Sequence, residues 1–392
     1  MIEPGDEAAL AEAVASAKGP LAIQGGGTRT SGRRAEGEAL SVAGLSGITF
    51  YEPGALTMVA KAGTPVAAIE AALAAEGQML AFEPFDLRRV TGASGASTIG
   101  GVFASNASGA RRVQAGAARD HLLGVRFVDG TGALVKSGGR VMKNVTGYDL
   151  VKLMAGSRGT LGVLSELSFK VLPKPAAQLS LEIGGLSDGE AVRAMSAAMR
   201  SPYSVTGALH APACIEEVAT TLIRVEGSQA SVAYRAERLA ALLREFGDAC
   251  IADAAESWQA ARGMMAFGRT LRGPGTLWSV SLRPSDAPDF VAGIVAAHAC
   301  LYSFDWAGGR IWIWTAETAA AQALHDALQG AAAARKGHAT LIHSAGGAAD
   351  RVALFQPEPA PLAAIAAGLR AKFDPRGILN PGLMAPAGQR EA

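Results

Sequence analysis

The chain has 392 residues, of which 49% are hydrophobic and 18% are charged, and its formal net charge at pH 7 is +1. This composition is typical of a globular protein rather than a disordered one, and the length favours two domains. The near-neutral charge gives no electrostatic basis for binding nucleic acid.

The three cysteines, Cys214, Cys250 and Cys300, are widely spaced, and no pair has CxxC spacing. They cannot form a framework of two disulfides and give no sign of a zinc or iron–sulfur site, so we expect buried, reduced thiols. The first residues lack the basic and apolar regions of a secretory signal, and no apolar run reaches the length of a membrane span. We therefore expect a cytoplasmic protein.

The first part of the chain alternates short apolar runs, expected as strands, with helices behind acidic or hydroxyl caps. Thr64 and Pro65 start one such helix and Gly77 ends it, while Asp129-Gly130 predicts a hairpin. The predicted helices are Asp6–Lys18, the segment from Pro65 to Gly77 and Asp149–Met154. The predicted strands are Pro20–Ile23, Met58–Lys61, Gly124–Val128, Ala133–Lys136 and Val163–Val171.

Pro173-Lys174-Pro175 breaks this pattern and predicts a domain boundary. Beyond it, strand-like runs alternate with helical ones, which indicates an antiparallel sheet with helices on one face and an α+β class. The predicted strands are Leu179–Ile183, Thr221–Val225, Leu277–Leu282, Arg310–Trp314 and Thr340–His343. The predicted helices are Asp188–Met199, Gln229–Phe246, Ala287–His298, Ala316–Leu328 and Pro361–Phe373.

A glycine-rich turn, Gly25-Gly26-Gly27, follows the first predicted strand. Without a Cβ, successive N–H groups can turn inward and form a nest for a pyrophosphate, and Thr28, Arg29 and Thr30 add two hydroxyl groups and a positive charge. The pattern is neither GxGxxG nor a P-loop with its lysine, which disfavours Rossmann and P-loop NTPase folds. An ordinary strand-to-loop turn is the alternative.

A second turn runs from Thr98 to Gly109 and joins glycines to small residues, which leaves room for a flat ligand against the backbone. Asn106 can donate and accept a hydrogen bond at once, which suits the edge of an isoalloxazine ring. A tightly packed loop without a ligand is the alternative. Two such turns in one half of the chain, each beside an apolar run, predict binding of a dinucleotide.

Three further segments, KNVTGYDL from Lys143, GSRGTLGV from Gly156 and FDPRGILNPG from Phe373, complete a specific pattern. In order and spacing, the turns and these segments resemble the FAD-binding domain of the vanillyl-alcohol oxidase/para-cresol methylhydroxylase (PCMH) superfamily. They are most similar to its 2-hydroxy-acid dehydrogenase branch, and there to the FAD-binding subunits of bacterial glycolate oxidases. The resemblance covers Pro20–Pro173 and Phe373–Gly382, and extends to the middle of the chain only in layout.

The resemblance implies a two-part PCMH-type FAD-binding domain (residues 1–173), an α+β cap domain with an antiparallel sheet (174–365) and a tail that returns to the FAD domain (366–392). It places Gly25, Gly26, Gly27, Thr28 and Arg29 on the pyrophosphate loop, to which we add Thr30. It places Thr98, Gly100, Gly101, Asn106 and Gly109 on the second loop, Gly159 and Val163 near the adenosine half, and Asn380 in the tail. Some relatives tether flavin through histidine or cysteine, but neither turn contains a histidine, so we expect non-covalent FAD.

The catalytic relatives carry an HxGDGNxH motif for a divalent metal and the substrate, and this chain lacks it. His338 and His343 come nearest, but positions five apart on a strand point to opposite faces, so we expect structural or surface histidines and no metal site. Three further groups of residues are candidates for the site.

The arginines Arg269, Arg272 and Arg283 could clamp a carboxylate, but we expect them to be solvated. We expect Trp306, Trp312 and Trp314 to pack in a core or interface. We expect Lys143 and Tyr148 to be structural or flavin-edge groups.

An intact FAD pocket without a metal site predicts an accessory FAD-binding subunit of a glycolate oxidase complex. The partners implied are a catalytic flavoprotein subunit and an iron–sulfur subunit, with membrane contact only through them. Two alternatives remain open: a self-sufficient FAD-dependent oxidase or dehydrogenase of another alcohol or 2-hydroxy acid, and a non-redox assembly subunit.

Overall fold

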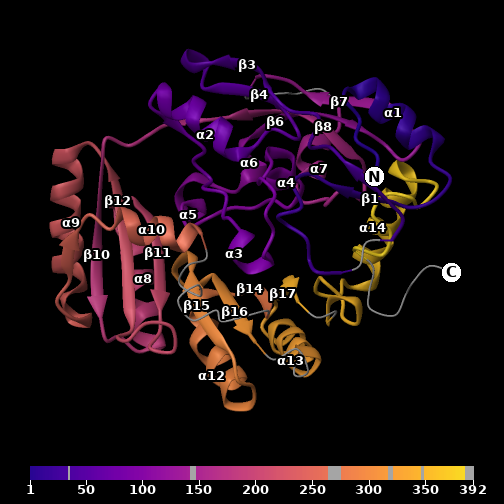
Figure 1. Ribbon diagram of the computed structural model, residues 1–392. Helices are drawn as coiled ribbons and strands as arrows, with labels where there is room; N and C mark the ends of the chain where they lie inside the picture. Colours follow the sequence, from indigo (N-terminus) through magenta and orange to yellow (C-terminus); the bar gives the residue numbers. More distant parts are fainter. Residues whose placement is uncertain (34–35, 142–146, 264–274, 317–320, 346–347, 385–392) are drawn as a thin grey trace.

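The computed structural model describes residues 1–33, 36–141, 147–263, 275–316, 321–345 and 348–384, which fold around two main sheets (Figure 1). The smaller sheet and its core come from the first part of the chain, and the larger sheet from residues 177–344. The mixture of helices and antiparallel sheets confirms the predicted α+β class.

The first part contains a five-stranded antiparallel sheet in the order β3-β4-β8-β6-β7, and β1 pairs in parallel with β2. Its strands are β1 (Leu21–Gln24), β2 (Glu38–Ser41), β3 (Ile48–Glu52), β4 (Thr57–Lys61), β5 (Gln78–Met79), β6 (Leu122–Val128), β7 (Leu134–Gly138), β8 (Val163–Lys170) and β9 (Leu172–Pro173). Its helices are α1 (Glu7–Ser16), η1 (Pro53–Ala55), α2 (Val66–Ala75), α3 (Arg88–Thr91), α4 (Ile99–Ala104), α5 (Arg112–Ala115), α6 (Ala118–His121) and α7 (Leu150–Met154).

Most predicted elements of this part are confirmed, and the hairpin shows why. Val128 pairs with Leu134 across the turn, and the Asp129 carboxylate accepts the backbone N–H groups of Thr131 (2.8 Å) and Ala133 (3.0 Å). This local hydrogen bonding is the turn chemistry that an Asp-Gly pair predicts.

The turn predicted from Thr98 to Gly109 is partly wrong, because its first residues form helix α4. Thr98 caps this helix, with its Oγ1 accepting the Gly101 N–H at 3.3 Å. Ile99, Val102 and Phe103 are fully buried at helical spacing, so burial of this stripe outweighs the poor helix propensity of the two glycines.

The second part contains an eight-stranded antiparallel sheet in the order β13-β10-β12-β11-β15-β16-β14-β17. Its strands are β10 (Ala177–Gly184), β11 (Val205–Ala211), β12 (Thr220–Gly227), β13 (Cys250–Ala252), β14 (Thr276–Ser281), β15 (Leu301–Asp305), β16 (Arg310–Thr315) and β17 (His338–Ser344). Its helices are α8 (Asp188–Arg200), α9 (Gln229–Leu243), η2 (Arg244–Phe246), α10 (Ala255–Arg262), η3 (Pro284–Asp286), α12 (Ala287–Ala297), η4 (Trp306–Gly308) and α13 (Ala321–Ala334).

Helices α8, α9, α12 and α13 share one core with the sheet and cover the face that looks away from the first part (Figure 1). The prediction of an antiparallel sheet with helices on one face is therefore confirmed for these helices, and α10 lies on the other face. Strands β11, β13 and β15 were not predicted. Strand β11 contains a glycine and two alanines, which are weak strand formers, and β15 is five residues long and ends at Asp305.

The end of the described chain returns to the first part through η5 (Ala348–Asp350) and α14 (Ala360–Phe373), which lies beside α1 in Figure 1. The Leu21 N–H donates to the Ile378 carbonyl at 2.7 Å, and Ile378 and Leu379 are buried in the core of the first part. This pairing places the next residue, Asn380, beside strand β1. No helix within the described ranges is long and apolar enough to cross a membrane.

Candidate FAD site

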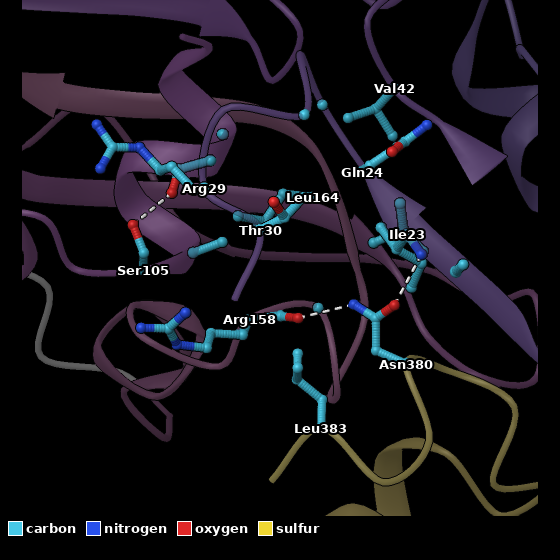
Figure 2. A pocket seen from close by; sticks show the side chains of 18 of the residues that line it. Ile23, Gln24, Arg29, Thr30, Val42, Ser105, Arg158, Leu164, Asn380 and Leu383 are labelled. Atoms are coloured by element: carbon cyan, nitrogen blue, oxygen red, sulfur yellow. Dashed lines mark hydrogen bonds between the residues drawn. The ribbon is translucent and has the colours of Figure 1, made fainter. Parts of the chain in front are cut away.

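An open cavity lies in the first part of the molecule (Figure 2). Its walls come mainly from four segments, namely the end of β1 with the turn after it, helix α4, the turn before β8 with the start of that strand, and the tail after α14; Glu36, Val42 and Ala62 complete the lining. The predicted site residues that line it are Gly25, Gly26, Gly27, Thr28, Arg29, Thr30, Thr98, Gly100, Gly101, Gly159, Val163 and Asn380.

The Gly25–Gly27 turn can exist only with glycine at its centre. A Cβ on Gly26 would lie 1.7 Å from the Ala96 carbonyl oxygen, and Gly27 has a φ of +69°. The backbone N–H groups from Gly25 to Arg29 donate no hydrogen bond to any described residue. Consecutive free N–H groups on a turn of this kind form a concave site for an anion.

Gly100 lines the cavity, but its N–H group is not available to a ligand. Its N–H donates to the Ala62 carbonyl at 2.8 Å, and a Cβ would lie 2.7 Å from the same oxygen. Gly100 therefore lets α4 approach β4 closely, and it shapes the cavity without offering it a donor.

Two arginines bring positive charge to the cavity without an ion-pair partner among the described residues. Arg29 donates through Nη2 to the Phe85 carbonyl at 2.6 Å, while its buried Nε and Nη1 have no partner in the part of the chain that the structure describes. Burial, together with a smaller effect of the nearby Arg158 charge, lowers the pKa of Arg29 to about 10. Burial also lowers the pKa of Arg158 to about 10. Both groups stay cationic at neutral pH, where an anionic ligand would relieve their repulsion.

Arg158 is the main site candidate that the sequence reasoning did not single out. It lies inside the GSRGTLGV segment and has a φ of +52°, which is uncommon for a residue with a side chain. The sequence held one signal for it, namely a charged residue between the glycines of this segment, which would have indicated an anion-binding group.

The tail closes one wall of the cavity through Asn380. Its Oδ1 accepts the Ile23 N–H at 2.7 Å, and its Nδ2 donates to the Arg158 carbonyl at 2.9 Å (Figure 2). A Cβ on Gly159 would lie 2.9 Å from the same Nδ2. The side chain therefore joins strand β1 to the turn before β8, which are distant in sequence.

Asn106 and Gly109 do not line this cavity. The Asn106 Oδ1 accepts the Arg119 N–H at 2.9 Å, and a Cβ on Gly109 would lie 2.3 Å from the Glu83 carbonyl oxygen. Gly109 lines a second cavity at the junction of the two parts. The predicted contact of these two residues with FAD stays a prediction. The geometry also gives each residue a structural role, since Asn106 binds the Arg119 backbone and Gly109 packs against Glu83.

The histidine pair lies on β17, and the prediction that its members point to opposite faces is wrong. The register with β14 shifts at a bulge, so His338 and His343 pair with Ser281 and Leu277, which lie four residues apart on one face. Five strand residues still separate the two side chains by about 16 Å, and His343 Nδ1 lies 3.0 Å from the Thr30 carbonyl oxygen. In the described part of the chain, no group of three or more His, Cys, Asp or Glu residues could hold a metal ion.

The remaining candidates have ordinary environments where they are described. Arg283 is exposed and pairs with Asp286 at 2.9 Å, and Tyr148 is exposed. Trp312 and Trp314 pack in a small cluster on the sheet face opposite the α8/α9/α12/α13 core, which confirms interface packing for them. Arg269, Arg272 and Lys143 lie outside the described residues.

The expected burial of the cysteines is wrong for two of them. Cys214 and Cys250 are exposed, and Cys300 is half-buried. Cys250 begins β13, an edge strand whose residues are all exposed, and Cys214 lies in the turn after β11. Neither position belongs to a buried face, which a search for CxxC pairs cannot show.

The sequence was compared with known families and proteins. The family described as a FAD binding domain matches residues 1–138. Over 370 residues, the chain is 37% identical to the glycolate oxidase subunit GlcE of Escherichia coli (strain K12), covering 94% of this chain and 93% of that protein. The chain belongs to the family of this oxidase subunit. FAD is its cofactor, and it is a FAD-binding oxidoreductase.

The chain also resembles a second glycolate oxidase subunit over a shorter stretch and a solved structure over nearly its whole length. The glycolate oxidase subunit GlcD of Bacillus subtilis (strain 168) is 41% identical over 85 residues, which cover 22% of this chain and 18% of that protein. A solved structure of alkyldihydroxyacetonephosphate synthase superposes with a TM-score of 0.70 at 16% identity, covering 97% of this chain and 76% of the other. At that identity the likeness shows the fold, and the fold is the PCMH type.

The cavity suits the cofactor of the family. Five successive backbone positions, Gly25 to Arg29, offer N–H groups that no described residue accepts, and Arg29 keeps two buried nitrogens without a partner. A pyrophosphate is rich in acceptor oxygens and negative charge, so it supplies what these donors lack. The residues present therefore fit FAD.

Proposed function

We propose that this chain is the FAD-binding subunit of a glycolate oxidase complex, in which glycolate is oxidised to glyoxylate. The observation that carries the proposal is the cavity built around Gly25–Gly27, with its unpartnered donors. Similarity to GlcE along nearly the whole chain supports the assignment to this kind of complex. When bound, FAD supplies two-electron transfer.

Within this proposal, each wall of the cavity has a task. The Gly25–Gly27 turn, Thr28 and Arg29 hold the pyrophosphate, with Arg158 as a second cation. Thr30, Thr98, Gly100 and Gly101 shape the central part. Gly159, Val163 and Asn380 form the opposite wall. The described lining contains neither histidine nor cysteine, which supports non-covalent binding.

The proposed partners are a catalytic flavoprotein subunit and an iron–sulfur subunit. The environments of the histidines support an accessory role, because His343 faces a backbone carbonyl and His121 lies between the carbonyls of Ala115 and Lys170. Burial lowers the pKa values of both imidazoles, which favours their neutral forms. We propose a cytoplasmic location, with membrane contact made by the partners.

The test is to purify the chain alone and together with both partners, and to measure FAD content and dye reduction by glycolate. We expect a yellow protein that reduces dye with glycolate only in the complex. Robust reduction by the isolated chain would disprove the accessory role. A colourless chain that takes up no added FAD would favour the non-redox assembly subunit.

A self-sufficient oxidoreductase is the second candidate, because the cavity at the domain junction joins arginines to aromatic rings. Arg310 lies 3.8 Å from the ring centre of Trp306 and 4.5 Å from that of Trp312. Its guanidinium is already engaged, since it pairs with Asp305 and donates to the Ser108 carbonyl at 2.8 Å. Anaerobic bleaching of the flavin by any small alcohol or 2-hydroxy acid would favour this candidate.

A further inference from the structure

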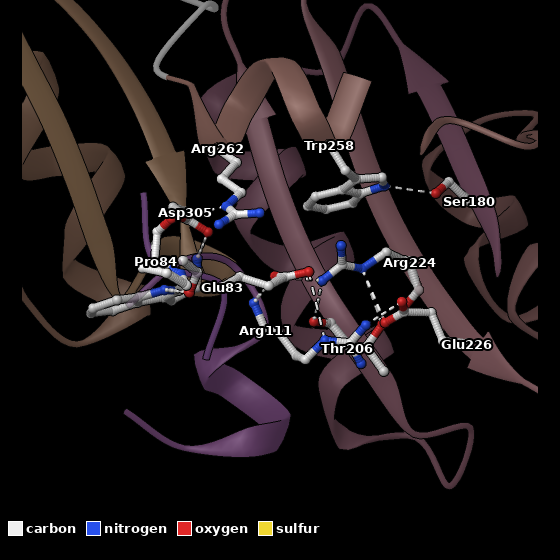
Figure 3. Close-up of polar contacts among 12 residues, drawn as sticks. Glu83, Pro84, Arg111, Ser180, Thr206, Arg224, Glu226, Trp258, Arg262 and Asp305 are labelled. Atoms are coloured by element: carbon white, nitrogen blue, oxygen red, sulfur yellow. Dashed lines mark hydrogen bonds and ion pairs between the residues drawn. The ribbon is translucent and has the colours of Figure 1, made fainter. Parts of the chain in front are cut away.

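The segment Glu83–Asp86 joins the FAD cavity to the second part of the molecule. Glu83 has a φ of +46°, a conformation that a residue with a side chain keeps only when its surroundings hold it. Its Oε2 accepts Nη2 of Arg224 on β12 and the backbone N–H of Arg111, both at 2.9 Å (Figure 3). The carboxylate therefore links the first part of the chain to the large sheet.

Glu83 belongs to a buried network of alternating charges. Arg111 pairs with Glu226, and the Nε of Arg224 lies 3.3 Å from the Oε2 of Glu226. Burial alone would raise the pKa of Glu83, but Arg224 and Arg111 outweigh this effect and hold the pKa below its ordinary value. Trp258 covers the network, with its ring centre 4.5 Å from the Arg224 guanidinium.

The next residues of the segment are held by helix α10. The Pro84 carbonyl accepts Nε of Arg262 at 2.9 Å, and the Asp86 N–H donates to the Arg262 carbonyl at 3.0 Å. Since both contacts come from one residue, the position of α10 fixes the backbone on either side of Phe85.

Phe85 is the point where the segment meets the FAD cavity. Its carbonyl accepts Nη2 of Arg29 at 2.6 Å, and its ring centre lies 5.2 Å from the Arg29 guanidinium. On the other side, the ring meets Trp312 edge-on, with centroids 5.4 Å apart and planes at 80°. Arg29 lines the cavity, whereas Arg224 and Trp312 line only the cavity at the junction.

We propose that Glu83 is a positioning residue that couples the large sheet to the FAD site. Arg224 fixes Glu83, the rigid Glu83–Asp86 segment fixes Phe85, and Phe85 fixes the cation of Arg29 in the cavity. Movement of the second part, for example on binding of a partner subunit, would then change FAD affinity. The inference rests on the proposed placement of FAD beside Arg29.

The test is a double-mutant cycle on the full chain with two single variants, Arg224→Met and Arg29→Met. We measure the Kd for FAD by fluorescence titration and record the visible spectrum of the bound flavin. Arg224→Met alone is expected to raise the Kd about fivefold, because residues that belong to one hydrogen-bond and ion-pair network typically couple by this amount. In the Arg29→Met background, Arg224→Met should change the Kd less than about twofold.

Two controls separate coupling from general damage to the fold. Arg283→Met removes an exposed arginine–carboxylate pair from the second part and should leave the Kd unchanged. Arg224→Lys keeps a charge beside Glu83 and should restore part of the lost affinity. Equal effects of Arg224→Met in both backgrounds, or no effect in either, would overturn the inference. Failure of the unaltered chain to bind FAD would instead overturn the proposed function.

Discussion

The FAD cavity and the Glu83 network differ in how their polar groups are satisfied. In the cavity, successive N–H groups after β1 and two nitrogens of Arg29 have no acceptor among the described residues. In the network, Glu83 and Arg224 bind each other, and even the two buried atoms without a hydrogen bond, Arg111 Nε and Glu226 Oε2, lie 3.6 and 3.3 Å from an opposite charge. Both sites are buried and rich in arginine. Buried donors without an acceptor indicate a ligand site, whereas paired buried charges indicate a contact that holds the two parts of the molecule together.

Gly26→Ala tests the cavity side of this comparison most severely. The added Cβ would lie 1.7 Å from the Ala96 carbonyl oxygen, so the turn must move and its N–H groups lose their common direction. We expect FAD affinity to fall at least about a hundredfold, equivalent to about 2.8 kcal/mol. The flavin absorbance of the purified protein measures this loss.

The matched control for that variant is Gly330→Ala, in helix α13. A Cβ there meets nothing within 4 Å, so FAD content should be unchanged. The helix should gain about 0.5–1 kcal/mol. Normal FAD content in Gly26→Ala would contradict the proposed site.

Glu83→Gln tests the Glu83 network between the two parts of the molecule. Removing one member of a buried ion pair leaves its partners uncompensated and lowers the free energy of unfolding by about 3–5 kcal/mol. Denaturant unfolding at pH 7 measures this loss. By contrast, Asp286→Asn breaks an exposed pair with Arg283 and should lower it by less than about 1 kcal/mol.

The loss from Glu83→Gln should depend on pH. Because the pKa of Glu83 is lower in the folded than in the unfolded chain, its charge adds stability above the unfolded pKa of about 4.3. That stability disappears as the pH falls through the folded pKa. The wild type and the variant should therefore converge in acid, and a constant difference down to pH 3 would argue against the network.

Arg29→Met and Arg158→Met test whether the two arginines without an ion-pair partner among the described residues strengthen FAD binding. A hydrogen bond to a charged group is worth about 1.5–3 kcal/mol, so each variant should bind FAD about tenfold to a hundredfold more weakly. Added salt should weaken binding by the wild type more than binding by either variant. Unchanged affinity in both would show that these charges act elsewhere.

The smallest expected effect distinguishes two asparagines with nearly the same backbone strain. Asn106 and Asn380 have φ values of +49° and +45°, so alanine is disfavoured equally at both. Asn380→Ala frees the tail from the cavity and should weaken FAD binding about tenfold, which is about 1.4 kcal/mol. Asn106→Ala should lower stability by about 1 kcal/mol with less than a roughly twofold change in FAD affinity. The reverse ranking would restore Asn106 as a flavin contact.

Local patterns made much of this structure predictable. Helix caps, the Asp129-Gly130 turn and the positive φ of Gly27 act within a few residues, so their signals survive in the sequence. Strands β11 and β15 escaped because the first contains a glycine and two alanines and the second is short and contains Ser303 and Asp305, so neither forms a continuous apolar run. The bulge in β17 escaped because strand register depends on the neighbouring strand as well as on the strand itself.

By itself, the sequence determined the α+β class, the two glycine-rich segments and, through its resemblance to a known family, the cofactor. Only the tertiary structure decided which residues of those segments share a cavity. Arg158 and Asn380 line the same cavity as Gly25–Gly27, whereas Asn106 and Gly109 lie outside its lining. The physical reason is that helix caps, tight turns and a positive φ act within a few residues, whereas the close contacts that exclude a Cβ and the pairing of buried donors and charges depend on segments that meet only in the folded chain.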